Sequence, residues 1–195
     1  HQMLEDIALM RALPNMTVIV PADGIEAAAA VKAAAEYKGP VYIRLGRSKV
    51  ETIFDENYKF RIGKGTVVKE GTDVTLFACG IMVETALKAA EILASDGINA
   101  AVVNLSTIKP LDSALIVKMA EETKAAVTCE EHTILGGLGS AVAEVLVENC
   151  PIPMERVGVE DKFGQSGLPD ELLKAYGLTA EKIAEKAKAA IARKA

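Results

Sequence analysis

The sequence has 195 residues, of which 50% are hydrophobic and 25% charged, with a net charge of −5 at pH 7. This composition is typical of a globular protein, and the length suffices for one full domain and part of a second. It disfavours nucleic-acid binding, because no basic stripe with interleaved aromatics occurs, and membrane insertion, because no apolar run could span a bilayer. Cys79, Cys129 and Cys150 are spaced too widely for a zinc or redox pair. We therefore expect a reduced, cytoplasmic protein.

The first 46 residues predict two successive helix–strand units. An apolar stripe over residues 4–13 predicts a helix, and a continuous apolar run at residues 17–20 predicts a buried parallel strand. Asp23 can cap an alanine-rich helix that extends to about residue 37, and residues 41–45 form the next predicted strand. Two parallel strands and two helices leave both sheet edges open, so we expect more of the same domain, or another subunit, to cover them.

Strand and helix patterns alternate regularly again from residue 63 onward. Residues 47–62, which precede them, are polar and rich in turn formers, and we interpret them as a linker. The predicted strands are residues 64–69, 74–78, 100–105, 125–129 and 155–159, and the predicted helices are residues 83–95, 113–122, 140–148, 169–176 and 180–191. This alternation predicts a doubly wound, mostly parallel α/β domain over residues 63–195, preceded by a partial α/β domain over residues 1–46.

A glycine-rich stretch at residues 136–140 follows one predicted strand and precedes a helix. Free N–H groups at such a helix start can bind an anion, but Val142 stands where the dinucleotide-binding pattern requires Gly or Ala, which favours a tight structural turn. Just before it, Glu130, Glu131 and His132 lie at the carboxyl end of the strand, where open α/β sheets bind ligands. They could perform acid–base chemistry, or they could be interface or solvated polar residues.

Two arginines, Arg44 and Arg47, flank the end of the strand predicted at residues 41–45. An arginine at the carboxyl edge of a sheet can hold a phosphate bidentately with its forked guanidinium group. A charged residue that leaves a buried strand can equally well extend into solvent. The residues alone leave both interpretations open.

Three blocks of the sequence resemble the transketolase family. The first is similar to the stretch beginning at the His-Gln of the family's Gly-Pro-Thr-His-Gln motif, the second to a strand ending in a substrate-phosphate arginine, and the third to the C-terminal signature. Together they most resemble the small, C-terminal subunit of split microbial transketolases. The blocks are His1-Gln2-Met3-Leu4-Glu5-Asp6-Ile7-Ala8 with Val20-Pro-Ala-Asp-Gly24, Tyr42-Ile-Arg-Leu-Gly-Arg-Ser48, and Asp161-Lys-Phe-Gly-Gln-Ser-Gly167 with Leu172-Leu-Lys-Ala-Tyr-Gly177.

The resemblance implies that residues 1–46 are the tail of a pyrimidine-binding domain and that residues 63–195 are the transketolase C-terminal domain. By the match of motifs, His1 resembles a histidine that contacts the substrate, and Arg47 resembles the arginine that holds the sugar phosphate. The family's activating glutamate, its diphosphate ligands and its metal ligands lie upstream of the matched region. We therefore assign this chain no complete catalytic set, no cofactor-binding residue and no metal ligand. Thiamine diphosphate and a divalent metal, Mg²⁺ or Ca²⁺, are expected only in the full enzyme.

These implications lead to one functional interpretation and two alternatives. We interpret the chain as the C-terminal part of a transketolase of the pentose phosphate pathway, which transfers a two-carbon ketol unit between sugar phosphates and is inactive as an isolated fragment. It would need the missing N-terminal half or subunit and would form a homodimer. The alternatives are a non-catalytic dimerisation or regulatory module, and the equivalent part of another thiamine enzyme, such as 1-deoxyxylulose-5-phosphate synthase or a pyruvate dehydrogenase β subunit.

Overall fold

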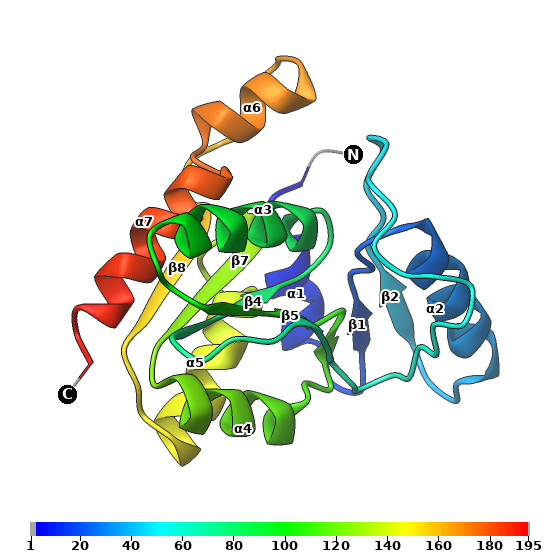
Figure 1. The fold of residues 1–195 in the computed structure, drawn as a ribbon. Helices are drawn as coiled ribbons and strands as arrows, with labels where there is room; N and C mark the ends of the chain where they lie inside the picture. Colours follow the sequence, from blue (N-terminus) through cyan, green and yellow to red (C-terminus); the bar gives the residue numbers. More distant parts are fainter. Residues whose placement is uncertain (1–2, 195) are drawn as a thin grey trace.

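The computed structural model describes residues 3–194 and begins with a small unit of two helices and two strands, which we call the front unit. In chain order these are α1 (Asp6–Ala12), β1 (Thr17–Ile19), α2 (Gly24–Glu36) and β2 (Val41–Ile43). β1 and β2 pair in parallel, which confirms the pairing expected from their alternation with helices. Figure 1 shows α2 and these two strands standing beside the larger sheet.

A strand that the sequence did not predict extends this small sheet. β6 (Thr107–Lys109) lies within the second half of the chain but pairs antiparallel with β1, giving the order β2-β1-β6. All three residues of β1 are buried, whereas those of β2 are only partly buried. This three-stranded sheet, which we call the front sheet, thus ends on one side at β6, from the second half of the chain, and on the other side at β2.

The larger domain is built on a five-stranded sheet in the order β3-β5-β4-β7-β8. Only the edge strand β3 runs antiparallel to its neighbour, and the other pairings are parallel. The predicted α/β fold with a mostly parallel sheet is therefore confirmed. The strands are β3 (Thr66–Lys69), β4 (Val74–Ala78), β5 (Ala100–Asn104), β7 (Ala126–Thr133) and β8 (Met154–Val159).

Helices cover both faces of this sheet, as a doubly wound fold requires. Successive residues of β4 point to opposite faces, so that Leu76 packs in the core beneath α3 (Met82–Ser95) and α7 (Ala180–Ile191). Phe77 packs in the opposite core, beneath α4 (Ser113–Thr123) and α5 (Leu138–Asn149). This second core also contains Ile7 of α1, which therefore joins the front unit to the larger domain.

α6 (Pro169–Ala175) differs from the other helices of the larger domain because none of its residues is buried. Figure 1 shows it projecting away from the two sheets, next to the start of α7. The chain that leads into it is exposed without interruption over residues 160–168. We call residues 160–168 the strap. Within residues 3–194, none of the helices has the length and apolar character needed to cross a bilayer.

The predicted linker contains no helix or strand, but it is anchored to the front unit. Asp23 caps α2 through the Glu26 N–H, and its second carboxylate oxygen accepts the N–H groups of Ile53 and Phe54 at 2.8 and 2.9 Å. Phe54 stacks on Tyr58 with ring centroids 3.9 Å apart. The linker thus fixes the start of α2 rather than separating two independent bodies.

Candidate functional site

The described candidate residues other than Arg47 gather where three segments meet. These segments are α1, the chain just after β2, and the end of β7 together with the loop that follows it. β7 continues to Thr133, so Glu130, Glu131 and His132 lie within the strand and not after it. The carboxyl ends of β2 and β7 therefore face each other across α1, although they belong to different sheets.

Arg44 takes part in a partly buried ion-pair network. Its guanidinium group lies 3.1 Å from the Asp6 carboxylate and 2.9 Å from that of Glu131, and Tyr42 donates its hydroxyl to Asp6 at 2.7 Å. Burial disfavours the charged guanidinium, but Glu131 and Asp6 outweigh this effect and raise the pKa of Arg44. Arg44 therefore links the front unit to β7, which makes it a structural residue and leaves it poorly placed to clamp a phosphate.

Arg47 differs from Arg44 in its exposure and in its contacts. It is exposed, and it forms no hydrogen bond or ion pair with any other residue between residues 3 and 194. Its guanidinium group is available for an external anion, so its predicted contact with a sugar phosphate remains a prediction. His1, the other predicted substrate contact, lies outside the described residues.

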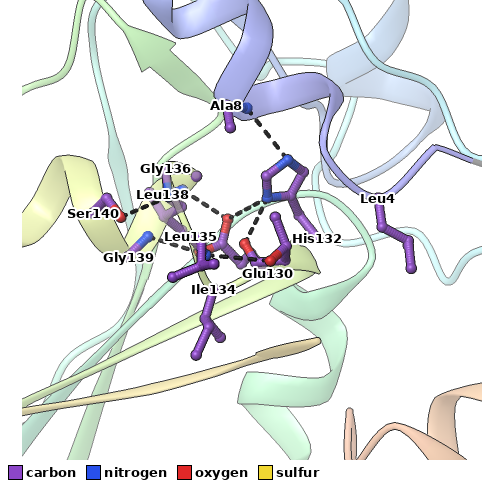
Figure 2. Close-up of polar contacts among 12 residues, drawn as sticks. Leu4, Ala8, Glu130, His132, Ile134, Leu135, Gly136, Leu138, Gly139 and Ser140 are labelled. Atoms are coloured by element: carbon purple, nitrogen blue, oxygen red, sulfur yellow. Dashed lines mark hydrogen bonds and ion pairs between the residues drawn. The ribbon is translucent and has the colours of Figure 1, made fainter. Parts of the chain in front are cut away.

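The glycine-rich loop forms an anion site that is filled by the chain's own carboxylate. Glu130 is 1% exposed, and its two oxygens accept the N–H groups of Leu138 and Gly139 at the start of α5, at 2.7 and 2.8 Å. Figure 2 shows this carboxylate enclosed by the loop. A Cβ atom at Gly137 would overlap the Glu130 carboxylate. The tight turn favoured from sequence is thus present, and its helix N-terminus is occupied.

His132 lies beside Glu130 and faces α1. Its Nδ1 is 2.7 Å from the Thr133 carbonyl oxygen and 3.6 Å from a Glu130 oxygen, while its Nε2 accepts the Ala8 N–H at 3.3 Å. Burial lowers the pKa of His132, and the same cause raises that of Glu130 to about 7. Burial thus disfavours the charged form of both side chains.

Arg11 ties α1 to the same loop from the other end of the helix. Its guanidinium group donates to the carbonyl of Gly136 at 2.6 Å and to the exposed Glu144 carboxylate at 2.8 Å. Sequence reasoning missed both Arg11 and Asp6 as contacts between the two units. Their positions in the first and last turns of a short helix were visible, but their partners lie 36 to 133 residues away along the chain.

The described residues do not by themselves fit a metal–diphosphate site. Among residues 3–194, no group of three or more His, Cys, Asp or Glu side chains could hold a metal ion. The buried carboxylates where α1, β2 and β7 meet are already paired. Asp6 pairs with Arg44, and Glu130 accepts hydrogen bonds from backbone N–H groups. We therefore derive no chemical step through thiamine diphosphate from this chain's described residues.

Two family models match the chain and together cover most of it. The model for the transketolase C-terminal domain matches residues 63–183, and the model for the transketolase pyrimidine-binding domain matches residues 1–52. The chain belongs to the transketolase family. The corner formed by α1, β2 and β7 thus joins the parts of a transketolase that match these two domain models.

Several relatives are similar to this chain over nearly all of its length. A 6-deoxy-6-sulfo-D-fructose transketolase subunit from Clostridium sp. (strain MSTE9) is 47% identical over 194 residues, which cover 100% of this chain and 60% of that protein. A putative transketolase C-terminal section from Methanocaldococcus jannaschii is 48% identical over 95% of this chain and 59% of its own length. A 1-deoxy-D-xylulose-5-phosphate synthase from Heliobacterium modesticaldum is 40% identical over 96% of this chain but only 30% of its own length.

A solved structure agrees in both sequence and fold. It is described as a split gene transketolase in an inactive beta4 tetramer, and it is 53% identical with a TM-score of 0.97. The match covers 99% of this chain and 63% of the other. The chain therefore spans about 60% of the transketolase subunits that it matches and corresponds to the C-terminal part of the family's enzymes.

Proposed function

We propose that this chain is the C-terminal component of an enzyme that transfers a two-carbon ketol unit between sugar phosphates with thiamine diphosphate. The observation that carries the proposal is the edge of the front sheet. Its two parallel strands, β1 and β2, lie in the part of the chain that matches the pyrimidine-binding domain, and the outer strand β2 is only half-buried. An open sheet edge of this kind needs a cover. We propose that further pyrimidine-domain strands cover it, and that a partner subunit supplies the ligands of the diphosphate and of Mg²⁺ or Ca²⁺.

In this proposal the chain itself contributes substrate positioning. Thiamine diphosphate, when bound in the complete enzyme, supplies the nucleophilic carbon and the electron sink that ketol transfer requires. Arg47, exposed just after β2, would hold the phosphate of the sugar with its forked guanidinium group. His1 would donate a hydrogen bond to a sugar or ketol hydroxyl. Binding energy from the remote phosphate then aligns the reacting carbon.

The proposed enzyme also contains more than one copy of this chain. The support is the solved relative described as a beta4 tetramer, whose fold this chain shares over 99% of its length. We propose that two copies of this chain associate in the cytoplasm with two copies of the partner subunit, as part of the pentose phosphate pathway.

Calorimetry tests the division of labour between the subunits. Thiamine diphosphate with Mg²⁺ is titrated into this chain alone and into its complex with the subunit that contains the diphosphate-binding domain. We expect tight binding and ketol transfer only in the complex. Tight cofactor binding to the chain alone would overturn the proposal, and a complex that accepts pyruvate as donor in place of a ketose phosphate would favour a deoxyxylulose-phosphate synthase.

A substitution at Arg47 tests the substrate class in the same complex. We expect Arg47→Ala to raise the KM for a sugar phosphate at least about tenfold, because a charge-assisted hydrogen bond contributes roughly 1.5–3 kcal/mol. The KM for the corresponding sugar without phosphate should not change. Arg61→Ala, at another exposed arginine, is the matched control. Equal effects of Arg47→Ala on both sugars would contradict the phosphate contact.

A further inference from the structure

We propose that His132 is a positioning residue of the proposed ketol transfer: as a neutral imidazole it caps the N-terminus of α1 and so holds the start of this helix against β7. The inference rests on the proposed function, because Asp6 at the start of α1 pairs with Arg44, three residues before the predicted phosphate contact Arg47. What the structure adds is a physical connection between β7 of the larger domain and α1.

α1 lacks a local cap, and His132 provides one from a distance. The N–H groups of the first helical turn have no acceptor within the helix. Glu5 occupies the N-cap position, but its side chain makes no capping hydrogen bond to the helix. The Nε2 of His132, 124 residues further along the chain, accepts the Ala8 N–H instead (Figure 2). The imidazole therefore accepts the capping hydrogen bond that a Ser or Asp side chain accepts at many other helix starts.

The hydrogen bonds of His132 define its tautomer. The Thr133 carbonyl oxygen, 2.7 Å from Nδ1, can only accept, so Nδ1 must carry the proton. Nε2 is then the unprotonated nitrogen and is free to accept from Ala8. Because the side chain is 0% exposed, burial disfavours the imidazolium ion and lowers the pKa of His132.

The charged groups around His132 act in both directions. On β7, Glu130 lies 3.6 Å from Nδ1; on α1, Asp6 favours the protonated ring; and after β2, Arg44 disfavours it. The backbone groups of Thr133 and Glu5 also favour the protonated ring, but burial is the largest influence and lowers the pKa of His132, so the neutral ring predominates near pH 7. Protonation in acid would turn Nε2 into a donor that faces the Ala8 N–H, and the cap would be lost.

The same strand end also holds the residues before α1. The Thr133 N–H donates to the Leu4 carbonyl at 2.8 Å, so His132 and Thr133 together fix both Leu4 and Ala8. Asp6 and Arg11 keep independent contacts with Arg44 and Gly136. Loss of the cap should therefore displace the start of α1 without releasing the helix, and such a displacement changes catalysis more than folding.

A matched pair of amide substitutions tests the cap. The Gln side chain of His132→Gln can place an acceptor near the position of Nε2, whereas the shorter Asn of His132→Asn reaches only the position of Nδ1. In the complex with the partner subunit, we expect His132→Asn to lower kcat/KM about 10- to 100-fold, mainly through kcat. His132→Gln should restore it to within about threefold of wild type and should remove the loss of activity in acid, because its amide does not titrate.

Hydrogen exchange on this chain provides a readout that does not depend on activity. The Ala8 amide should exchange at least about tenfold faster in His132→Asn than in His132→Gln or wild type. The 15N shifts of His132 should show an Nδ1-protonated ring, and because the chain has two histidines the assignment follows by comparison with His132→Gln. Ile183→Val, at a buried core position of α7, controls for a general loss of stability.

Each outcome decides the proposal. Equal Ala8 exchange in the two amide variants would overturn the cap. Faster exchange in His132→Asn with unchanged kcat/KM would overturn the positioning role, because the cap would then be structural only. If the wild-type complex transfers no ketol unit, the proposed function fails and the positioning role fails with it, while the exchange result still decides whether the cap exists.

Discussion

Glu130 shows how a single buried carboxylate can occupy a site that its sequence context offers to ligands. Two backbone N–H groups at the start of α5 favour its ionised form, but burial outweighs them and raises its pKa to about 7. Both halves of the arrangement were visible in the sequence, the glycine-rich anion site and the carboxylate before it. That they satisfy each other could not be predicted, because it depends on the turn that Gly136 makes with a φ of 77°.

The raised pKa of Glu130 makes stability depend on pH in a defined direction. The folded protein holds this proton up to about pH 7, whereas the unfolded chain releases it near the ordinary value of 4.5. The free energy of unfolding should therefore fall as pH rises from about 4.5 to 7, by about 2–3 kcal/mol between pH 5 and 8. Urea unfolding of His132→Gln, compared with His132→Gln carrying Glu130→Gln, isolates this contribution from the titration of His132. A difference that does not vary with pH would show that Glu130 ionises normally.

At the scale of the elements, the start of α5 depends on the absence of a side chain at Gly137. A Cβ atom there would overlap the Glu130 carboxylate and lie 2.7 Å from Nδ1 of His132. We expect Gly137→Ala to lower the free energy of unfolding by about 2–3 kcal/mol, because neither buried neighbour can move away. Gly24→Ala, at the start of α2 where nothing lies within 4 Å, is the control and should be neutral or slightly stabilising. Similar costs for both variants would exclude the steric explanation.

Helix caps and strand alternation could be predicted because they are local. Asp23, Asp112 and Thr179 each cap the helix that their sequence position indicated. β6 could not be predicted in this way, since its three residues show no periodicity and its partner β1 lies about 90 residues earlier. The same limit applies to the candidate site. Arg44 and Arg47 looked equivalent in the sequence, and only the positions of Asp6 and Glu131 distinguish the partly buried, paired arginine from the exposed one.

At the scale of the whole molecule, the two units are joined too extensively to act as separate domains. β6 enters the front sheet, Ile7 enters the core of the larger domain, and Glu26 at the start of α2 accepts hydrogen bonds from Asn104 of β5 at 2.9 and 3.0 Å. Glu26 is fully buried, so separating the units would leave it without these partners. In the proposed assembly, the open edge of β2 and the exposed strap of the larger domain are therefore two surfaces that another subunit could cover.

The strap is the part of the larger domain that the proposed assembly should cover. Phe163 is 94% exposed, while its carbonyl is held by the Tyr176 hydroxyl at 2.7 Å, so the ring is presented on an anchored backbone. An aromatic side chain in this position is typical of an interface. We expect the occupant to be a second copy of this chain, in keeping with the proposed self-association.

Phe163→Ser should separate association from folding. It should leave the free energy of unfolding of the dilute chain within about 0.5 kcal/mol of wild type, because an exposed ring contributes little to the core. It should weaken self-association about 10- to 100-fold in sedimentation experiments over a range of concentrations. Val147→Ser removes a side chain that is 71% exposed on α5 and should leave association unchanged. If Phe163→Ser associates as tightly as wild type, a different surface joins the copies and the strap must be covered by something other than a second copy of this chain.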